Sequence, residues 1–400
     1  MQNKPIVVMK QMPILVLNSG SSSIKFSLFQ ASGNERSKLF EGAVDGIGTD
    51  RGKFWIKDAS GKKLRDETPA LPTRNVAFKL VADALGQPPF PYPAAIGHRM
   101  VAGGPHLTRH QRITPEVLDE MELNVAFAPL HTPIAVYIMR EAEILFPGVP
   151  NFVCFDTAFH TTIPEVAQRF AIPEQYWEKG VRRYGAHGIS YESIVYQLGK
   201  DVPERLIVAH LGNGSSITAI KHGKSLDTSM GLTPTGGLIS GTRTGDIDPG
   251  VLLYILRDIT GGADELETIV AKKSGLLGTS QLSNDMRELR DAVAAGNQHA
   301  AMAVAQFAYS VKKFIGSYIG VLGGLDMLVF TGGIGENDIA ARREICAGLE
   351  HLGIIIDAKR NDVRGEAVIS SEASPVLVRV IPPAEDLLIA NHAYKMMQEA

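Results

Sequence analysis

Two glycine-bordered loops of this sequence each present an arginine that could bind an anion. GTRTGDIDPG, residues 241–250, contains Arg243, and GHRMVAGG, residues 97–104, contains Arg99 directly after a short apolar run. The planar guanidinium group matches the oxygens of a phosphate or a carboxylate, so both arginines are candidates for a reacting centre. Two ordinary alternatives stay open: Arg243 could pair with a carboxylate of its own loop, and Arg99 could form an exposed basic pair with His98.

Three histidines lie in turns that are rich in glycine or proline. They are His131 in APLHTP, His187 in YGAHGIS and His210 in VAHLGNG. A lone histidine is usually a polar residue with its hydrogen bonds satisfied, whereas three in such turns favour donors to an anionic group. Their spacing does not match a zinc site.

Two Gly/Ser turns repeat the same layout about half a chain apart. Residues 14–29, ILVLNSGSSSIKFSLF, and residues 206–223, LIVAHLGNGSSITAIKHG, each predict a strand, a tight turn and a second strand. Small residues at such a tip let backbone N–H groups approach phosphate oxygens, although the same residues also make ordinary hairpin turns. A repeat on this scale predicts two related domains, and two such hairpins predict a nucleotide in a cleft between them.

A third glycine-rich segment and two carboxylates are the remaining candidates for binding a nucleotide or a metal ion. TGGIGEN, residues 331–337, follows an apolar strand and is expected to precede a helix; it could bind a nucleotide or be an ordinary turn, and it matches neither the Walker nor the GxGxxG pattern. Asp156 ends the predicted strand PNFVCF, and Glu385 opens the last predicted helix. Both could hold Mg²⁺ directly or through water, although Glu385 could also be a first-turn acid that stabilises its helix.

The elements that must position these residues are strands in the first part of each half, followed by strand and helix in alternation. This order predicts a mixed α/β fold built twice. Helical spacing and breaker residues predict helices at or near residues 74–85, from 115, and at 132–146, 249–257, 263–273, 285–295, 299–322 and 384–398.

The composition limits the classes of protein to which this sequence can belong. Four hundred residues suit two domains, and 44% hydrophobic with 21% charged residues is typical of a globular protein. A formal net charge of −3 provides no broad basic surface, so we expect neither nucleic acid nor a membrane as a partner. Cys154 and Cys346 are too few for a disulfide framework, and the apolar run at residues 5–9 is too short for a signal peptide. We therefore expect a cytoplasmic protein with a loose extension at residues 1–11.

The motifs in their order resemble the acetate kinase family, within the superfamily of acetate and sugar kinases, heat-shock proteins and actin. The resemblance spans residues 13–396 and rests on HRMVAGG, APLHTP, FDTAFH, RRYGAHG, HLGNGSS, GLTPTGGLISGTRTGDIDPG, SNDMREL and TGGIGEN. It implies an α/β fold of two duplicated ribonuclease-H-like, actin-like ATPase domains with a nucleotide cleft between them. The domains would be residues 1–155, with the C-terminal helix 387–400 packing on them, and residues 156–386.

The activity that the resemblance implies is reversible transfer of the ATP γ-phosphoryl group to a short-chain carboxylate, giving acyl phosphate and ADP. It also implies a homodimer and a requirement for Mg²⁺ or Mn²⁺. A carboxylate is already ionised near neutral pH, so the enzyme needs no strong base and must chiefly bring two anions together.

The resemblance also assigns roles by position. Catalytic roles fall to Arg99, Asp156, His187 and Arg243, with Asp156 orienting or contacting a metal-bound water before acting as a base. The metal-associated residues are Asn18 and Glu385. Nucleotide binding falls to Lys25, His210, Leu211, Gly212, Asn213, Gly214, Asp285, Met286, Arg287, Gly333, Ile334, Gly335, Glu336 and Asn337.

Several positions depart from the family pattern, and one concerns the substrate. The family commonly has an aromatic residue where this chain has Ala186, and that residue helps to enclose the acetate methyl group. The other substrate-binding positions are Arg99, Val101, Leu130, His131 and Pro234. Alanine should leave a larger pocket, so acetate is the expected substrate and a preference for propionate or a slightly longer acid is the alternative.

Three further departures lie beside assigned residues. His-Asn-Pro is here His131-Thr132-Pro133, Asn-Glu is here Ala384-Glu385, and His-Gly-Thr-Ser-His is here His187-Gly188-Ile189-Ser190-Tyr191.

Two other classes share the predicted fold. An actin-like or chaperone ATPase would have the hairpin loops without needing Arg99, Arg243 and His187 around a small acid. A non-catalytic nucleotide-binding protein could keep the loops after losing the chemistry, although the proposed reacting residues are all present here.

Overall fold

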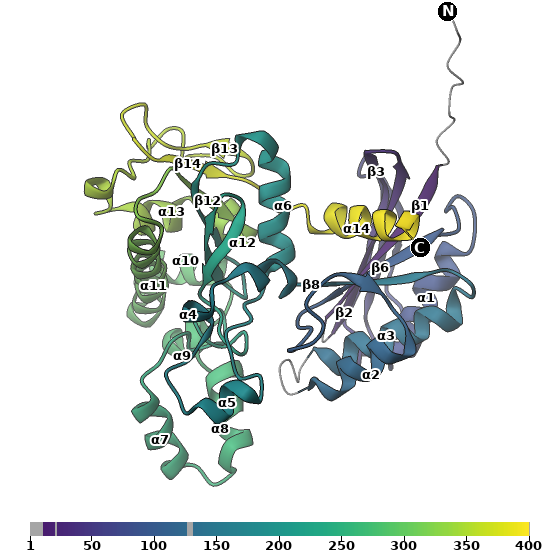
Figure 1. Ribbon diagram of the computed structural model, residues 1–400, viewed down its shortest axis with the longest axis horizontal. Coiled ribbons are helices and arrows are strands. Elements are labelled where there is room, and N and C mark those ends of the chain that lie inside the picture. The colour runs from purple at the N-terminus through teal and green to yellow at the C-terminus, as the bar shows by residue number, and fades with distance from the viewer. Residues whose placement is uncertain (1–10, 21, 126–130, 400) are drawn as a thin grey trace, which may run out of the picture. The chain divides into compact units, whose positions relative to one another are not determined.

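The computed structural model describes residues 11–20, 22–125 and 131–399, which group by their contacts into two compact units (Figure 1). Unit 1 is Met1–Ala158 with Ala384–Ala400, and unit 2 is Phe159–Pro383. Within the described residues each unit is built on one sheet, of eight strands in unit 1 and of six in unit 2. The mixed α/β fold with a sheet in each half confirms the fold class predicted from the sequence. Across the same residues no helix is both long enough and apolar enough to cross a bilayer.

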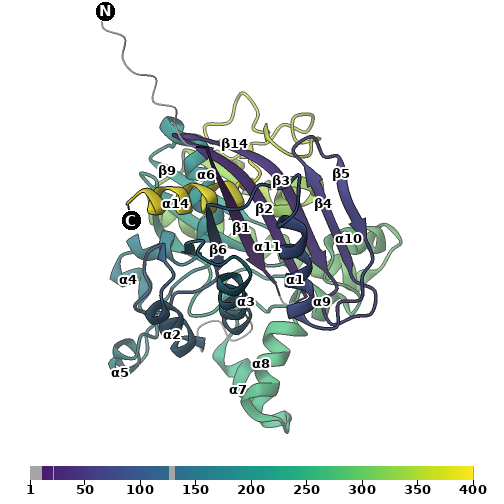
Figure 2. The same ribbon diagram turned by 90° about the vertical axis from the view of Figure 1, so that its right-hand side faces the viewer.

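The sheet of unit 1 places three strand ends at one edge. Its order is β5-β4-β3-β2-β1-β6-β8-β7, and β1 to β5 lie side by side in Figure 2. β1 and β2 form the predicted hairpin, while β1, β6 and β8 run parallel, so their carboxyl ends meet. The strands are β1 (Met12–Ser19), β2 (Ser23–Ser32), β3 (Glu35–Asp45), β4 (Lys53–Asp58), β5 (Lys63–Glu67), β6 (Ala95–Met100), β7 (Gln111–Arg112) and β8 (Asn151–Phe155).

Helices cover both faces of this sheet. α1 (Arg74–Leu85) and α3 (Thr132–Leu145) pack on one face, where Leu15 and Phe78 share a buried cluster, and α14 (Glu385–Glu399) lies on the other (Figure 1). A Cβ built at Gly97 of β6 would lie 2.6 Å from Ile389 Cγ2 of α14, so the close approach of this helix requires glycine. α2 (Pro115–Leu123) begins as predicted, with Thr114 as its N-cap and proline in its first turn.

The sheet of unit 2 brings two loops together. Its order is β11-β10-β9-β12-β14-β13. β9 and β10 form the second predicted hairpin, and β9 runs parallel to β12 with His210 beside Thr331. The segments that follow His210 and Thr331 therefore leave the same edge of the sheet. The strands are β9 (Arg205–His210), β10 (Ser216–Lys221), β11 (Lys224–Thr228), β12 (Met327–Thr331), β13 (Ala367–Val368) and β14 (Leu377–Val380).

Helices also cover both faces of the second sheet. The long α11 packs on one face, and α6 packs on the other (Figure 1), where Tyr191 and Ile194 meet Leu206 and Val208. The α-helices are α4 (Glu165–Gln168), α5 (Glu174–Glu178), α6 (Gly188–Leu198), α7 (Pro249–Asp258), α8 (Gly262–Lys272), α9 (Gly275–Ser280), α10 (Met286–Ala294), α11 (Gln298–Leu322), α12 (Gly332–Asn337) and α13 (Ile339–Cys346). The 3₁₀ turns are η2 (Ala158–Thr162), η3 (Gly199–Asp201) and η4 (Glu350–Leu352).

The TGGIGEN segment differs from the glycine-rich loop predicted before a helix, because it is itself helical. α12 starts directly after β12, and Asp338 then caps α13 by accepting from Ala341 N–H at 2.9 Å. Gly332 has a φ of 78°, and a Cβ there would lie 2.8 Å from Leu211 O. Glycine at this position allows the strand to turn straight into a helix beside the β9 loop.

Candidate active site

Arg99 and Asp156 form an ion pair at the carboxyl edge of the unit 1 sheet. Arg99 is near the end of β6, and Asp156 directly follows β8, the parallel neighbour of that strand. Arg99 Nη2 donates to Asp156 Oδ2 at 2.7 Å, and Arg99 Nε donates to Oδ1 at 3.4 Å. The Asp156 side chain is 1% exposed and that of Arg99 is 20% exposed. The arginine is thus held by a buried carboxylate while part of it still reaches solvent.

His98 does not form the exposed basic pair with Arg99 that one alternative predicted. It is buried, and its Nε2 lies 2.8 Å from Asn151 Oδ1. Burial lowers the pKa of His98 to about 4, and the hydrogen bond to Asn151 opposes this effect only in part. His98 is therefore a neutral core residue at neutral pH.

Two more residues assigned from the sequence lie around Arg99. Asn18, at the end of β1, accepts from Arg99 Nη1 at 3.4 Å, and Glu385 opens α14. Burial raises the pKa of the Glu385 carboxyl, and the positive charges of Arg99 and Lys25 lower it only in part. Lys25 is exposed on β2, opposite Asn18.

The carboxylates of Asp156 and Glu385 keep Arg99 protonated. Burial alone would lower the pKa of Arg99, but the carboxylates of Asp156 and Glu385 outweigh burial and raise it. Arg99 is therefore permanently cationic, which suits a residue that must bind a carboxylate.

Oxygen atoms of Asn18, Asp156 and Glu385 are the chemically suitable ligands for a divalent cation in this unit. Mg²⁺ prefers oxygen ligands and is usually held by one or two carboxylates with water and substrate phosphates. Two acids and an amide around one arginine fit that requirement. The buried Glu385 carboxyl, whose pKa is raised, would lose its proton more readily beside a bound cation.

In unit 2, His187 and His210 lie stacked at the end of β9. Their ring centroids are 4.3 Å apart, with an angle of 24° between the rings. His210 ends β9, and His187 is the residue before α6, with a left-handed φ of 55°. His187 Nδ1 lies 2.8 Å from Ser216 Oγ, and His210 Nδ1 lies 2.8 Å from Ser190 Oγ. Sequence reasoning assigned roles to the histidines but gave none to these two buried serines.

Arg243 approaches the same loop. A Cβ built at Gly214 would lie 3.3 Å from Arg243 Nη1 and 3.5 Å from His187 Nε2. Arg243 Nη1 also donates to Pro234 O at 3.3 Å, and burial lowers the pKa of Arg243. The two cationic or polar side chains thus converge on the glycine of the second Gly/Ser turn.

Arg243 and the two carboxylates of its loop bond to different partners. Asp246 accepts from Gly237 N–H and Asp248 accepts from Gly250 N–H, each at 2.7 Å. Among the described residues no ion pair joins Arg243 to either carboxylate, so the structural alternative for Arg243 is wrong. The two acids shape the loop through these bonds.

The segments assigned to the nucleotide surround this loop. Leu211 O accepts from Ile334 N–H at 2.8 Å and from Gly335 N–H at 3.2 Å, which joins the loop after β9 to α12. Asn213 Oδ1 accepts from Asn284 Nδ2 at 2.9 Å. Their neighbours differ in exposure: Gly212 and Gly214 are half-buried, and Gly333 and Asn337 are exposed.

The start of α10 and the end of α12 complete this group. Asp285 caps α10 and pairs with the exposed Arg287 at 2.6 Å, while Met286 is buried. Burial raises the pKa of the half-buried Glu336.

The residues assigned to the substrate wall divide between the units. Ala186 is 3% exposed, and its carbonyl lies 3.0 Å from His160 Nε2; Pro234 is half-buried beside Arg243. Val101 and His131 are half-buried in unit 1. Leu130 lies outside the described residues.

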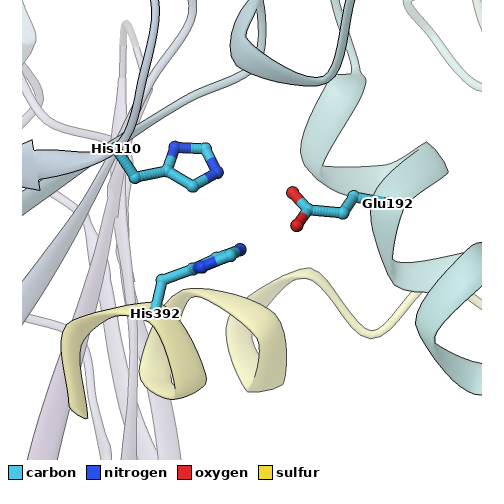
Figure 3. A group of neighbouring side chains, drawn as sticks. All are labelled: His110, Glu192 and His392. Atoms are coloured by element: carbon cyan, nitrogen blue, oxygen red, sulfur yellow. The ribbon is translucent and has the colours of Figure 1, made fainter. Parts of the chain in front are cut away.

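One histidine pair in unit 1 was not singled out by the sequence. His110 and His392 have ring centroids 4.3 Å apart (Figure 3), and His110 Nδ1 accepts from Phe155 N–H at 3.1 Å. Glu192, also drawn in Figure 3, belongs to unit 2. Because Nδ1 of His110 accepts a hydrogen bond, its neutral ring carries the proton on Nε2. This pair supports the end of β8, directly before Asp156.

Comparison with known proteins gives full-length matches. A family model described as the Acetokinase family matches residues 13–391. Acetate kinases of Phocaeicola vulgatus and Moorella thermoacetica are each 42% identical, and each match covers 97% of this chain and 100% of the relative.

Solved structures match equally well. A Porphyromonas gingivalis acetate kinase has a TM-score of 0.87, and a Francisella tularensis propionate kinase has a TM-score of 0.90. Both are 38% identical, and each match covers 96% of this chain and 100% of the other. The fold of this chain is therefore the fold of those enzymes.

Proposed function

This chain belongs to the acetate kinase family, and we propose that it catalyses the reversible, Mg²⁺-dependent transfer of the ATP γ-phosphoryl group to a short-chain carboxylate. Acetate is the proposed substrate, and acetyl phosphate and ADP are the products. The observation that carries the proposal is the convergence of Arg243 Nη1 and His187 Nε2 on Gly214. A backbone turn flanked by a cation and a ring N–H is suited to a transferring phosphoryl group.

The proposed reaction needs little covalent chemistry from the protein. A carboxylate oxygen attacks the γ-phosphorus, the bond to the β,γ-bridging oxygen breaks, and ADP leaves with that electron pair. Arg99 would bind and orient the carboxylate, held in place by Asp156. Arg243 and His187 would stabilise the charge on the phosphoryl oxygens, which lowers the repulsion between the two anions.

The nucleotide is proposed to bind in unit 2. His210 and residues 211–214 would contact the phosphates, and the start of α10 with α12 would contact the adenosine. The residues proposed to bind the carboxylate belong to unit 1, and those proposed to bind the phosphoryl group belong to unit 2. The reaction requires both sets at one phosphoryl group, so closure of the protein around its substrates is part of the proposal.

Mg²⁺ is proposed to be held through Asn18 and Glu385, with Asp156 contacting one of its waters. When bound, the cation would neutralise phosphate charge and orient the nucleotide. Lys25, whose charge already acts on Glu385, would add a further positive charge near the phosphates.

Acceptance of propionate is the finer alternative for the substrate. Ala186 is buried, and at a position where the family resemblance implies an aromatic residue its shorter side chain would enlarge the pocket. A family structure named a propionate kinase is as similar to this chain as one named an acetate kinase, so either acid fits the comparisons.

Assembly as a homodimer is also part of the proposal, and α7 supports it. Residues 251–256, VLLYIL, are all apolar, yet α7 has no buried residue, and Tyr254 is 73% exposed. A helix that is apolar on every side is normally covered. We propose that a second copy covers it.

A groove of unit 2 is the proposed seat for this helix in the second copy. The groove has a volume of about 850 Å³, with apolar walls from Tyr309 and Phe314 and positive charge from Lys273 and Lys313. α8, which packs against α7, carries acidic residues in its first turn, so the charges are complementary.

The assembly test compares molecular mass in solution. The wild type should have twice the chain mass of 43.2 kDa, and Tyr254→Glu should be monomeric. Val166→Glu, a matched change at an exposed position on α4, should leave the dimer intact. A monomeric wild type would disprove the dimer, and a dimeric Tyr254→Glu variant would disprove this surface.

Location in the cytoplasm is proposed from the cysteines. Cys154 and Cys346 are both buried and not in a disulfide bond. Thiols that are not in disulfide bonds are typical of cytosolic proteins.

Trapping the acyl phosphate with hydroxylamine tests the activity directly. Purified protein with ATP, Mg²⁺ and acetate should form hydroxamate, and omission of either ATP or acetate should abolish it. ATP hydrolysis without hydroxamate would instead indicate the actin-like ATPase, and nucleotide binding without turnover would indicate a non-catalytic protein.

A further inference from the structure

We propose that Ser190, Tyr191 and Ser216 are positioning residues that keep His187 and His210 as neutral donors through Nε2. The inference rests on the proposed function, because it assigns these Nε2–H groups to the transferring phosphoryl group. It is supported by a set of buried hydrogen bonds in unit 2. The roles assigned to the two histidines do not explain these bonds.

The first turn of α6 organises both histidines. His187 directly precedes the helix, and Ser190 and Tyr191 follow three and four residues later. Ser190 Oγ lies 2.8 Å from His210 Nδ1. Tyr191 OH bonds to Ser216 Oγ, which in turn lies 2.8 Å from His187 Nδ1. Ser190, Tyr191 and Ser216 are each 0% exposed.

The chain from Tyr191 to His187 has a preferred direction. Each hydroxyl has one proton, and a phenol is a stronger donor and a weaker acceptor than a serine hydroxyl. Tyr191 therefore donates to Ser216, and Ser216 donates to His187 Nδ1. Because Nδ1 accepts, the neutral ring of His187 carries its proton on Nε2.

A proton on Nε2 places the N–H donor of each ring at the loop proposed to bind phosphate. His187 Nε2 would lie 3.5 Å from a Cβ at Gly214, and His210 Nε2 would lie 4.0 Å from a Cβ at Gly212. Both nitrogens thus face the loop proposed to hold the phosphates. The Ser190 hydroxyl, if it donates to His210 Nδ1, gives that ring the same tautomer.

Stacking explains why neutral donors suit this place. Two imidazolium rings with centroids 4.3 Å apart would repel each other, whereas two neutral rings do not. The positive charge near Gly214 is supplied by Arg243. The histidines then add N–H donors without adding a second and third charge in the same space.

Tyr191 stands at a position where the resemblance to the family implies a histidine. Tyr191 packs against His160, with ring centroids 5.7 Å apart, and against Phe159, with centroids 6.4 Å apart. The aromatic packing fixes the ring and therefore the place of its hydroxyl. The departure noted in the sequence thus has a structural counterpart, which is a phenol in the hydrogen-bond chain.

Two variants test the inference in the full-length protein. Tyr191→Phe removes only the hydroxyl and keeps the packing, and Ser216→Ala removes the group that contacts Nδ1. Thr218→Val is the matched control, because it removes a buried hydroxyl of the same strand that bonds to Thr228 and not to a histidine. Thermal unfolding of each variant reports whether it folds.

The primary readout is the ¹⁵N chemical shift of the two His187 ring nitrogens, assigned with a His187→Asn sample. The wild type and Thr218→Val should show a protonated Nε2 and an unprotonated Nδ1. In Ser216→Ala and Tyr191→Phe the proton should distribute over both nitrogens. An unchanged Nε2 tautomer in both variants would overturn the inference.

Kinetics give a second readout. Removing a direct oxyanion donor costs 10² to 10³ in kcat, so loss of its support should lower kcat about tenfold. The KM for the acid should change less than about twofold, since the hydroxyls act on the phosphoryl side. A wild type without acyl phosphate formation would refute the proposed function alone, because the tautomer measurement needs no turnover.

Discussion

Both carboxylate oxygens of Asp156 contact the guanidinium group of Arg99, Oδ2 at 2.7 Å from Nη2 and Oδ1 at 3.4 Å from Nε. The parallel strands β6 and β8 create this pair by placing Arg99 beside Cys154, two residues before Asp156. Such two-point contact fixes the plane of the guanidinium group. Asp156 is therefore better placed to orient Arg99 than to remove a proton from a substrate that has none to lose.

Asp156→Asn should lower kcat/KM for the carboxylate about 10²-fold, because an amide keeps the size of the side chain but loses the charge that orients Arg99. Steady-state kinetics with varied acetate would measure this change. Asp227→Asn, at an acid paired with Arg183 at 3.7 Å in unit 2, is the control and should stay near wild type. Activity of Asp156→Asn within twofold of wild type would contradict the orienting role.

Arg243→Ala should lower kcat about 10³-fold, as expected for an arginine that stabilises a transferring phosphoryl group. The fold should survive, since the single side-chain hydrogen bond of Arg243 among the described residues goes to Pro234 O at 3.3 Å. Hydroxamate formation measures the rate and the melting temperature measures the fold. Arg360→Ala, at an exposed ion pair with Glu372, is the control. Near-normal turnover of Arg243→Ala would refute its role.

The sequence predicted the elements with strong apolar periodicity and clear caps. The hairpins at residues 14–29 and 206–223 and the helix from Pro115 are confirmed, because turn and cap residues specify them locally. The repeat also predicted two related domains, and the structure contains two compact units that are each built on one sheet. Local rules were sufficient here because neighbouring residues alone determine these features.

Features that depend on distant partners were harder to predict. The Arg99–Asp156 pair depends on strand register, and the buried state of His98 depends on Asn151, which is 53 residues away. From the sequence, Ser216 could be recognised only as part of a Gly/Ser turn, because no residue near it in the sequence identifies His187 as its partner. TGGIGEN was predicted as a glycine-rich segment between a strand and a helix, whereas a positive φ at Gly332 lets the strand turn directly into the short α12.

Ala186→Phe should narrow the range of acids. The wild type should use propionate with kcat/KM within about tenfold of acetate, because the wider pocket would accept the extra methylene, a group worth about 1 to 3 kcal/mol in such a pocket. The variant should lose propionate and butyrate and keep acetate. Ile172→Phe, at an exposed position of unit 2, is the control and should not change the order of acids. A steep fall after acetate in the wild type would reject the wider pocket.

Glu385→Gln should change how stability depends on pH. Burial raises the pKa of this carboxyl in the folded state, so the stability that it contributes is present at low pH and is lost as the pH rises through its folded pKa. Without Mg²⁺, the melting temperature of Glu385→Gln relative to wild type should therefore increase from pH 4 to pH 8. A difference that does not vary with pH would contradict the raised pKa.

Mg²⁺ in the same experiment tests the metal site. A cation held by ionised Glu385 should raise the melting temperature of the wild type at pH 8 and raise that of Glu385→Gln less. Glu372→Gln, at an exposed acid of unit 2, is the control and should respond to Mg²⁺ as the wild type does. Equal responses of wild type and Glu385→Gln would remove Glu385 from the site.

Gly97→Ala should destabilise unit 1, because the added Cβ would lie 2.6 Å from Ile389 Cγ2 of α14. Overpacking of this kind costs about 1 to 3 kcal/mol in the free energy of unfolding, which chemical denaturation can measure. Gly316→Ala is the matched control: it lies in α11 with nothing within 4 Å of its Cβ, and it should be neutral or stabilising. Combining Gly97→Ala with Ile389→Ala, which removes the opposing Cγ2, should cost less than the sum of the two single changes if the contact with α14 is the cause. Strict additivity would place the cost elsewhere in β6.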